Sequence, residues 1–562
     1  MSLDLHALVR GGRLRRADVA LGELVARLFP DGAPEVALAA ALAARAIADG
    51  HSALQLDAAQ AWFESLEGTG TAPWLPEFAS WRAALHDSAA VAVPPVDDAT
   101  ATTRNVPLVL DPQGRLYLRR YFEYERCLAR TLIARAHQRR LELITGGPGT
   151  GKTHGVLQRL VELAWAAHAQ SRSLRIALAA PTGKAAARLA ESVRTQREAL
   201  DLPGPVAAMI PHQAQTLHRL LGLSPVAARA GFHRAAPLPF DVVVVDEVSM
   251  VDLPLMTKLA AAVREDAVLI LLGDPDQLSA VEAGDVLGAL VQAAGEASLE
   301  ACHVRLSHSR RFDEHSSLAR LAQAVVRGDA DAALATFAQE GGARLLDDDA
   351  RHAHWIERAA SAYHDVVDAA DARAALQAAS RFRVLTALRR GPFGCVALNR
   401  AIEQDLKRRV GVRADSAWWR GRLVMVTANR ADIGLFNGDI GVAWPDAQGE
   451  IKVCFEAADG VLRALAPAAL PPHEGAFALT VHKAQGSEFE RVALVPGADS
   501  PVLTRELLYT GITRARALVE IHADAGLLRA GIACRTLRWN GLADRLREAA
   551  AGSIAESLPV SF

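Results

Sequence analysis

Lysine is scarce in this sequence. Of the 62 basic residues only six are lysines, which leaves 56 arginines. A chain with such a preference keeps lysine where a compact ammonium group is wanted, or by chance. The six lysines are Lys152, Lys184, Lys258, Lys407, Lys452 and Lys483. Three of them lie inside the motifs described below, so these three are candidates for functional roles.

Cysteine and long apolar runs are also scarce. The five cysteines lie far apart and include no C-x-x-C pair, so we expect neither a disulfide framework nor a zinc site. No apolar run reaches the roughly 18 residues that a membrane span needs, and the N-terminus has no basic region followed by an apolar stretch. These absences favour a reducing, cytoplasmic location and no membrane partner.

Neither sign of charge is in excess. Lys+Arg total 62 against Asp+Glu 64, a formal charge of -2. This balance does not favour a general polyanion binder, although a local basic channel is compatible with it. With 562 residues, of which 51% are hydrophobic and 22% charged, the chain is predominantly folded and long enough for three or four domains.

The chain divides by pattern into a helical N-terminal part and a long α/β part. Residues 1–105 are predicted to form a helical domain, with helices such as 35–48 and 53–66 and a linker from 91 to 107. Its core is expected to contain three tryptophans. These are Trp62, Trp74 and Trp81.

Beyond this domain, short apolar runs of strand length alternate with helical segments. Such alternation predicts parallel sheets covered by helices on both faces. The expected strands are 141–145, 174–180, 241–245 and 267–272, then 384–387, 476–481 and 491–495. We therefore expect two α/β domains, at 106–335 and 336–562. The second contains a stretch rich in Gly, Asn and Asp, near 415–472, that predicts a small β insertion.

The clearest motif directly follows the first of these strands. Residues 146–153 match G-x-x-x-x-G-K-[ST], in which backbone N–H groups surround the phosphates of a nucleotide. Lys152 would reach the β and γ oxygens, and the Thr153 hydroxyl would ligate Mg²⁺. The predicted nucleotide-binding residues are Gly146, Gly147, Pro148, Gly149, Thr150, Gly151, Lys152 and Thr153. ATP and Mg²⁺ are thus the expected ligands, and a glycine-rich turn before a helix is the alternative.

Two further motifs supply polar side chains at strand ends. Four valines precede Asp246 and Glu247, so that Asp246 would hold Mg²⁺ and Glu247 would polarise the attacking water. Gln277 follows the next strand and could sense the γ-phosphate; a turn or capping role is the alternative. Phosphoryl transfer also needs an additional positive charge. Arg311 and Arg514 are candidates for it, although spacing alone does not separate them from surface arginines.

Together these segments resemble superfamily 1 helicases, and most closely the RecD family, the alpha subunits of exodeoxyribonuclease V. The resemblance covers roughly residues 110–530 in ten ordered motifs. Besides 146–153 and 245–250, the matching segments are 180–186, 216–222, 273–278, 309–312, 387–394, 435–441, 480–489 and 509–515. One departure is that residues 115–126 contain no glutamine, the residue with which these helicases often read adenine.

The resemblance implies two tandem RecA-like P-loop domains, an SH3-like β insertion in the second, and ATP bound between them. It makes Arg514 the expected arginine finger and Arg311 a second γ-phosphate contact. It also implies contacts to single-stranded DNA that do not depend on sequence. The DNA-binding candidates are Thr182, Lys184, Thr216, His218, Thr480, His482 and Lys483. For His482 a buried, hydrogen-bonded role remains open.

The function that this resemblance implies is an ATP-dependent 5′→3′ DNA helicase, the motor subunit of a RecBCD-type complex in DNA repair and recombination. Its partners would be single-stranded DNA, duplex ends, and RecB-like and RecC-like subunits, the latter contacted by the helical domain. No cluster of carboxylates with a lysine resembles a nuclease centre. The alternatives are a stand-alone RecD-like helicase, a nucleotide-dependent switch or kinase, and a structural subunit with a decayed ATPase.

Overall fold

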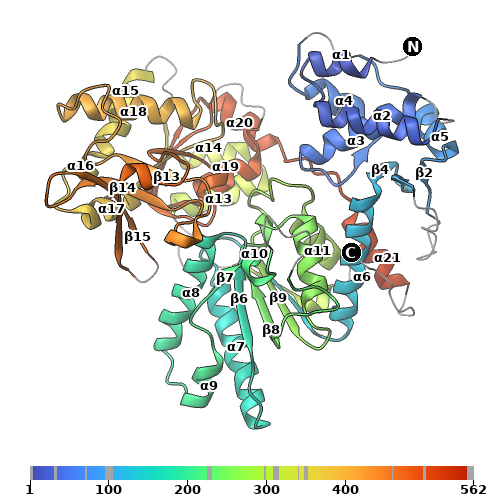
Figure 1. The fold of residues 1–562 in the computed structure, drawn as a ribbon, viewed down its shortest axis with the longest axis horizontal. Helices are drawn as coiled ribbons and strands as arrows, with labels where there is room; N and C mark the ends of the chain where they lie inside the picture. Colours follow the sequence, from blue (N-terminus) through green and yellow to red (C-terminus); the bar gives the residue numbers. More distant parts are fainter. Residues whose placement is uncertain are drawn as a thin grey trace.

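The structure is a computed structural model in which the chain forms three structural units (Figure 1). We name them the N-terminal unit, the first α/β unit and the second α/β unit. The described residues are 4–30, 34–69, 73–94, 106–223, 231–295, 299–307, 316–339, 341–346, 352–457, 460–497 and 502–552. Within them, no helix is both long enough and apolar enough to cross a membrane.

The N-terminal unit packs five helices around an apolar core. They are α1 (Leu5–Arg10), α2 (Arg16–Leu28), α3 (Pro34–Ala48), α4 (Ala59–Ser65) and α5 (Phe78–Asp87). Trp81 is buried in this core as predicted, and Trp62 is partly buried against it. The prediction for Trp74 was wrong, because this side chain is 82% exposed. It lies between Pro73 and Pro76 in an irregular segment, outside the helices that direct side chains into the core.

A small sheet completes this unit and corrects its expected limit. Its strands, in the order β1-β4-β3-β2, are β1 (Leu54–Gln55), β4 (Arg115–Leu118), β3 (Leu108–Leu110) and β2 (Val91–Ala92). The sheet joins residues on both sides of position 105, so the expected boundary cuts through it and the unit extends to Leu118. Part of the expected linker, 95–105, lies outside the described residues. Strands of two to four residues are too short to show an alternating pattern.

The first α/β unit is built on a six-stranded parallel sheet. In sheet order the strands are β10 (His303–Leu306), β5 (Leu141–Gly146), β9 (Val268–Gly273), β8 (Val242–Val245), β6 (Ile176–Ala180) and β7 (Gln215–Thr216). The helices are α6 (Arg119–His137), α7 (Lys152–Ala169), α8 (Gly183–Glu198), α9 (Gly204–Met209), α10 (Leu217–Leu220), α11 (Leu253–Ala262) and α12 (Val286–Gly295). Helices α6, α11 and α12 share one core with the sheet, and α7 and α8 share the other. The four strands expected here are confirmed within two residues at either end.

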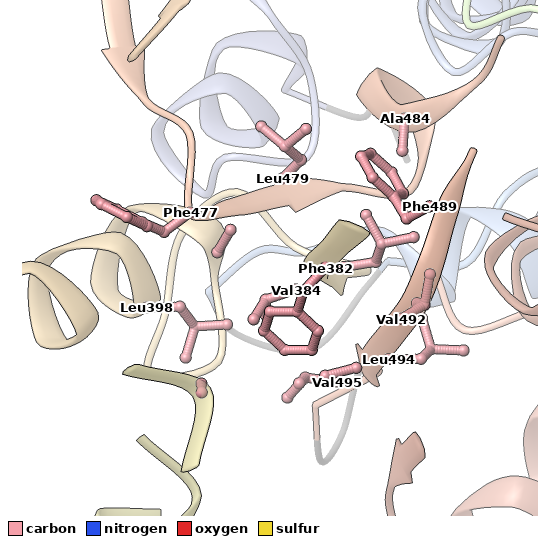
Figure 2. Close-up of a cluster of buried hydrophobic side chains, with 14 of the residues drawn as sticks. Phe382, Val384, Leu398, Phe477, Leu479, Ala484, Phe489, Val492, Leu494 and Val495 are labelled. Carbon is pink, nitrogen blue, oxygen red and sulfur yellow. The ribbon is translucent and has the colours of Figure 1, made fainter. Parts of the chain in front are cut away.

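The second α/β unit repeats this design with five parallel strands. In sheet order they are β11 (Ala343–Leu346), β20 (Ala515–His522), β19 (Phe489–Val495), β12 (Phe382–Thr386) and β18 (Ala478–Thr480). The helices are α13 (Ser317–Arg327), α14 (Ala330–Thr336), α15 (His352–Ala362), α16 (His364–Val367), α17 (Ala372–Arg381), α18 (Cys395–Arg409), α19 (Arg505–Ile512) and α20 (Ala525–Ala533). Figure 2 shows part of its core, which includes Phe382, Val384 and Leu494. Leu318 and Leu321 of α13 belong to this core, so the unit begins before the expected limit at 335.

The β insertion in the second unit is confirmed. It is a five-stranded antiparallel sheet with its own small core, which contains Val424, Ala443 and Phe455. The strands, in the order β16-β15-β14-β13-β17, are β16 (Leu462–Leu465), β15 (Ile451–Glu456), β14 (Ile440–Pro445), β13 (Leu423–Val426) and β17 (His473–Gly475).

The residues that follow α20 leave the second unit, although the expected domain 336–562 placed them there. After α20, residues 535–541, which we call the C-terminal strap, lead to α21 (Leu542–Ala551). Figure 1 shows α21 beside α6, and Leu542 and Leu546 are buried in the core of the first unit. An amphipathic helix must bury its apolar face, but its sequence does not specify which neighbour covers that face.

Candidate nucleotide and DNA sites

The nucleotide motifs converge at one edge of the first sheet. Strands β5, β9 and β8 are adjacent and parallel, and each carries a motif at its carboxyl end. The phosphate loop 146–153 follows β5, Asp246 and Glu247 follow β8, and the loop 273–278 begins at the end of β9. Ligands of open α/β sheets bind at this edge, so the predicted nucleotide residues occupy the expected place.

Two glycines of the predicted phosphate loop adopt a left-handed backbone conformation. Gly149 and Gly151 adopt φ of 77° and 85°, a region that favours glycine, and Gly151 precedes the first residue of α7. Lys152 donates from Nζ to the carbonyl oxygens of Gly146 and Gly147, the latter at 3.0 Å. The ammonium thus lies over the loop, where the oxygens of a nucleotide would compete for it. The long helix α7 directs its N-terminal N–H groups to the same place.

Asp246 and Glu247 are held rigidly behind this loop. Asp246 donates its N–H to the Ala179 carbonyl at 2.9 Å, and its Oδ1 accepts from the Glu247 N–H at 2.8 Å. Glu247 has φ 54° and ψ 44°, a left-handed conformation that is rare for residues other than glycine and concentrates at functional sites. Burial and the neighbouring Glu247 raise the pKa of Asp246 to about 6. Carboxylate and hydroxyl oxygens are the donors that Mg²⁺ prefers, so Asp246 and Thr153 could hold this ion.

Gln277 is joined to the second α/β unit. Its amide nitrogen donates to Asp274 Oδ2 at 2.9 Å, and its Oε1 accepts a hydrogen bond of 3.1 Å from Nη2 of Arg514. Asp274 Oδ2 also accepts from the Tyr509 hydroxyl at 3.0 Å. Burial lowers the pKa of Arg514, while the Glu247 carboxylate opposes that shift. An arginine of one unit therefore reaches the nucleotide motifs of the other.

Asp274 and Tyr509 are site residues to which the sequence pattern assigned no role. Both lie inside matching segments, 273–278 and 509–515, but neither has a spacing that identifies its partner. Arg311 lies outside the described residues. Strand β10, which precedes it, ends beside the phosphate loop, since Leu306 pairs with Gly146.

The DNA-binding candidates of the first unit lie further along the same edge. Thr182 caps α8 by accepting from the Ala185 N–H at 3.2 Å, and Thr216 caps α10 in the same way. Lys184 is held 6.0 Å from the ring centroid of Phe489, on the second unit. Burial and two nearby guanidinium groups lower the pKa of Lys184 to about 8. His218, on α10, is exposed to solvent.

The candidates of the second unit follow β18 at its carboxyl end. Thr480 is buried and its Oγ1 accepts from the Lys483 N–H at 3.4 Å. The Lys483 ammonium lies 2.5 Å from a carboxylate oxygen of Glu474. Burial lowers the pKa of His482, which agrees with the alternative of a neutral, packed histidine.

Helix α8 connects these two sets of candidates. Arg188, one turn beyond Lys184, donates to the Gly486 carbonyl at 2.8 Å and forms a 2.5 Å ion pair with Glu488. The segment that contains Thr480 and Lys483 therefore contacts the helix that Thr182 caps. Thr216 lies one strand further out, on β7 at the edge of the sheet.

Comparisons with known proteins identify the family. A family model described as the N-terminal domain of RecBCD enzyme subunit RecD matches residues 10–117, and models for an AAA domain and a UvrD-like helicase C-terminal domain match 129–283 and 475–521. RecBCD enzyme subunit RecD of Mycolicibacterium smegmatis is 38% identical over 574 residues, which cover 95% of this chain and 98% of that protein. The chain belongs to the RecD family. It is an ATP-dependent DNA helicase with two RecA-like domains.

Other relatives match a smaller share of the chain. RecBCD enzyme subunit RecD of Haemophilus influenzae is 33% identical, covering 74% of this chain and 72% of that protein. The ATP-dependent RecD2 DNA helicase of Deinococcus radiodurans is also 33% identical, but the match covers 67% of this chain and only 46% of that protein. Among solved structures, a Bacteroides Pif1 bound to ssDNA aligns at 16% identity with a TM-score of 0.37, covering 71% of this chain and 93% of that one.

Proposed function

We propose that this RecD-family chain is a 5′→3′ DNA translocase, the motor subunit of a cytoplasmic RecBCD-type exodeoxyribonuclease V that acts on duplex ends. The observation that carries the motor assignment is the hydrogen bond between Arg514 and Gln277. A cleft whose charges come from two units can couple hydrolysis to their relative movement.

In this proposal Lys152, Arg514 and Arg311 neutralise the phosphates of ATP as charge develops on them. Thr153 and Asp246 would hold Mg²⁺, which would supply positive charge to stabilise the negative charge that develops on the phosphates. Glu247 orients the attacking water, and its fixed backbone conformation supports this role. Gln277 and Arg514, which are hydrogen-bonded to each other, would turn toward the γ-phosphate when ATP binds.

The DNA strand would lie across the carboxyl edges of both sheets. Thr182 and Lys184 supply hydroxyl, amide and ammonium donors on one side, and Thr480 and Lys483 do so on the other. Such groups bind phosphates without reading bases, as a motor that must accept any sequence requires. The contact between α8 and residues 486–488 would open and close as the units move, so that the strand is gripped alternately.

The matches to known proteins favour the subunit over a stand-alone helicase. The match spans 98% of the mycobacterial RecD but 46% of the RecD2 helicase, and the N-terminal unit matches the RecD model. The N-terminal unit would be the docking surface for a RecC-like subunit, and its exposed Trp74 fits a role in such a contact. Co-expression with the RecB-like and RecC-like subunits of the same organism should yield a stable heterotrimer.

The deciding experiment is ATP-driven strand displacement on duplexes that carry either a 5′ or a 3′ single-stranded tail. Unwinding of the 5′-tailed duplex alone is the expected result. Unwinding from the 3′ tail would refute the polarity. Robust unwinding by the isolated chain, with no binding to RecB-like or RecC-like subunits, would favour the stand-alone alternative.

A further inference from the structure

The Tyr509 side chain occupies the join between the two α/β units. It is 6% exposed, and its hydroxyl lies so near the phosphate loop that a Cβ atom added at Gly147 would be 2.9 Å from it. The hydroxyl donates to Asp274 at 3.0 Å, across the two units. Burial and the Asp274 carboxylate raise the pKa of Tyr509 well above its ordinary value, so this hydroxyl is protonated and acts as a donor.

Asp274 in turn determines which way the Gln277 amide points. Its Oδ1 accepts from the Asp276 N–H at 3.1 Å, and its Oδ2 accepts from both Tyr509 and the Gln277 amide nitrogen. A carboxylate only accepts hydrogen bonds, so the amide must present its nitrogen to Asp274. The Gln277 oxygen is then left facing Arg514, which only donates. If the Gln277 amide were flipped, its nitrogen would face the Arg514 guanidinium, and two hydrogen-bond donors would oppose each other.

We propose that Tyr509 is a positioning residue for the arginine finger. By fixing the Asp274 carboxylate, its hydroxyl fixes the orientation of Gln277 and so aligns Nη2 of Arg514 with the Gln277 oxygen. The rest of the guanidinium donates to the Thr510 and Ser487 carbonyls of its own unit. This inference rests on the proposed function, since it concerns how the same ATPase site is organised.

Other contacts hold the units together without the Tyr509 hydroxyl. The Leu278 N–H donates to Thr510 Oγ1 at 2.9 Å, and the Gln485 amide nitrogen donates to the Leu278 carbonyl at 3.0 Å. Both contacts involve the same loop and the same unit as the Tyr509 bond. Removing one hydroxyl should therefore leave the units docked and change only the alignment of Gln277 and Arg514.

The test is Tyr509→Phe in the full chain, measured by steady-state, DNA-stimulated ATP hydrolysis. We expect kcat to fall about tenfold, the effect of losing one hydrogen bond to a charged group. The KM for ATP should stay within about twofold, because the phosphate loop is untouched. Asp274 also loses a donor that favours its charged form, so its pKa should rise and the acid limb of the kcat–pH profile should move to higher pH. The other charged groups that face Asp274 are Lys152, Asp276 and Arg514.

The matched control is Tyr363→Phe, which removes another buried hydroxyl from the second unit. Tyr363 donates to the Phe477 carbonyl inside that unit, away from the cleft. This variant should lose stability but keep the wild-type kcat and pH profile. If Tyr509→Phe behaves like Tyr363→Phe, the positioning role is wrong while the ATPase assignment stands.

A double-mutant cycle tests the pairing without relying on turnover. Tyr509→Phe and Asp274→Ala should be non-additive in thermal unfolding, since each variant removes the same hydrogen bond. Additive effects would overturn the inference. If the cycle shows this coupling but the wild-type chain hydrolyses no ATP, with or without DNA, the proposed function is refuted instead.

Discussion

Nη2 of Arg514 and Oε1 of Gln277 lie 3.1 Å apart although 237 residues separate them in the sequence. This bond makes the proposed nucleotide site a property of two units, because neither unit alone contains both groups. It also places the guanidinium against an amide that a γ-phosphate could replace.

Replacing Arg514 by lysine should therefore disable hydrolysis while leaving ATP bound. Lysine keeps the charge but not the planar fork, and an arginine finger is worth about 10³ or more in turnover. We expect kcat to fall at least a hundredfold, with little change in the affinity for a fluorescent ATP analogue. The control is Arg516→Lys, whose exposed side chain pairs with Glu488. Equal losses in both variants would show that Arg514 has no special role.

Lys152→Gln should abolish ATP hydrolysis and leave the fold intact. Among the described residues, the ammonium donates to the loop carbonyls of Gly146 and Gly147, and the side chain is half-buried. Circular dichroism should report a wild-type melting curve, while phosphate release falls to background. Lys258→Gln, at an exposed position of α11, is the control and should hydrolyse ATP normally. Turnover that survives in Lys152→Gln would contradict the phosphate-loop assignment.

The affinity for single-stranded DNA should fall between pH 7 and pH 9. The pKa of Lys184 is lowered to about 8, so its ammonium is charged at pH 7 and mostly neutral at pH 9. If Lys184 contacts a phosphate, the affinity should fall by up to about tenfold over this range. Lys184→Arg, which stays charged, should remove most of the fall. Identical pH profiles for the two proteins would place Lys184 away from the DNA.

The contact between the N-terminal unit and the C-terminal strap should weaken in acid. The His51 ring stacks on the Trp539 ring with their centroids 4.3 Å apart, and its Nδ1 accepts from the Trp539 backbone N–H at 2.9 Å. Burial together with Arg538 lowers the pKa of His51 from 6.5 to about 4. A lowered pKa means that the unfolded chain binds the proton more readily. The stabilisation is therefore complete above pH 6.5 and is lost as the pH falls toward 4.

Between pH 7 and pH 5 this loss should amount to about 2 kcal/mol. The wild-type unfolding temperature should accordingly fall more over this interval than that of His51→Gln, which keeps a hydrogen-bond acceptor but does not titrate. His6→Gln, at an exposed position, should behave like the wild type. A wild-type protein whose unfolding temperature is no more sensitive to acid than that of His51→Gln would contradict the predicted titration.

The site could be predicted from sequence where it depends on local chemistry. Four consecutive valines are fully buried in β8, and such apolar runs next to polar motifs identify central strands of a parallel sheet. The phosphate loop, Asp246 and Gln277 follow three such strands, so their meeting at one edge could be foreseen.

What could not be predicted depends on distant contacts. Tyr509 and Asp274 are 235 residues apart, and nothing in the spacing of either motif relates the two. The short strands β1 to β4 form because they pair with one another between positions 54 and 118, not because of an alternating pattern. The prediction that Trp74 is a core residue failed for a local reason. This aromatic residue lies between two prolines, outside the helices that form the core.

The position of α21 determines the order in which this protein can fold during synthesis. Its residues Leu542 and Leu546 complete the apolar core that α6 and α12 begin hundreds of residues earlier. As the chain emerges from the ribosome, the apolar face of the first α/β unit that α21 covers stays exposed until the second unit and α21 have been translated. Such a nascent face is a natural binding site for chaperones, and premature termination after α20 would leave it permanently exposed to aggregation.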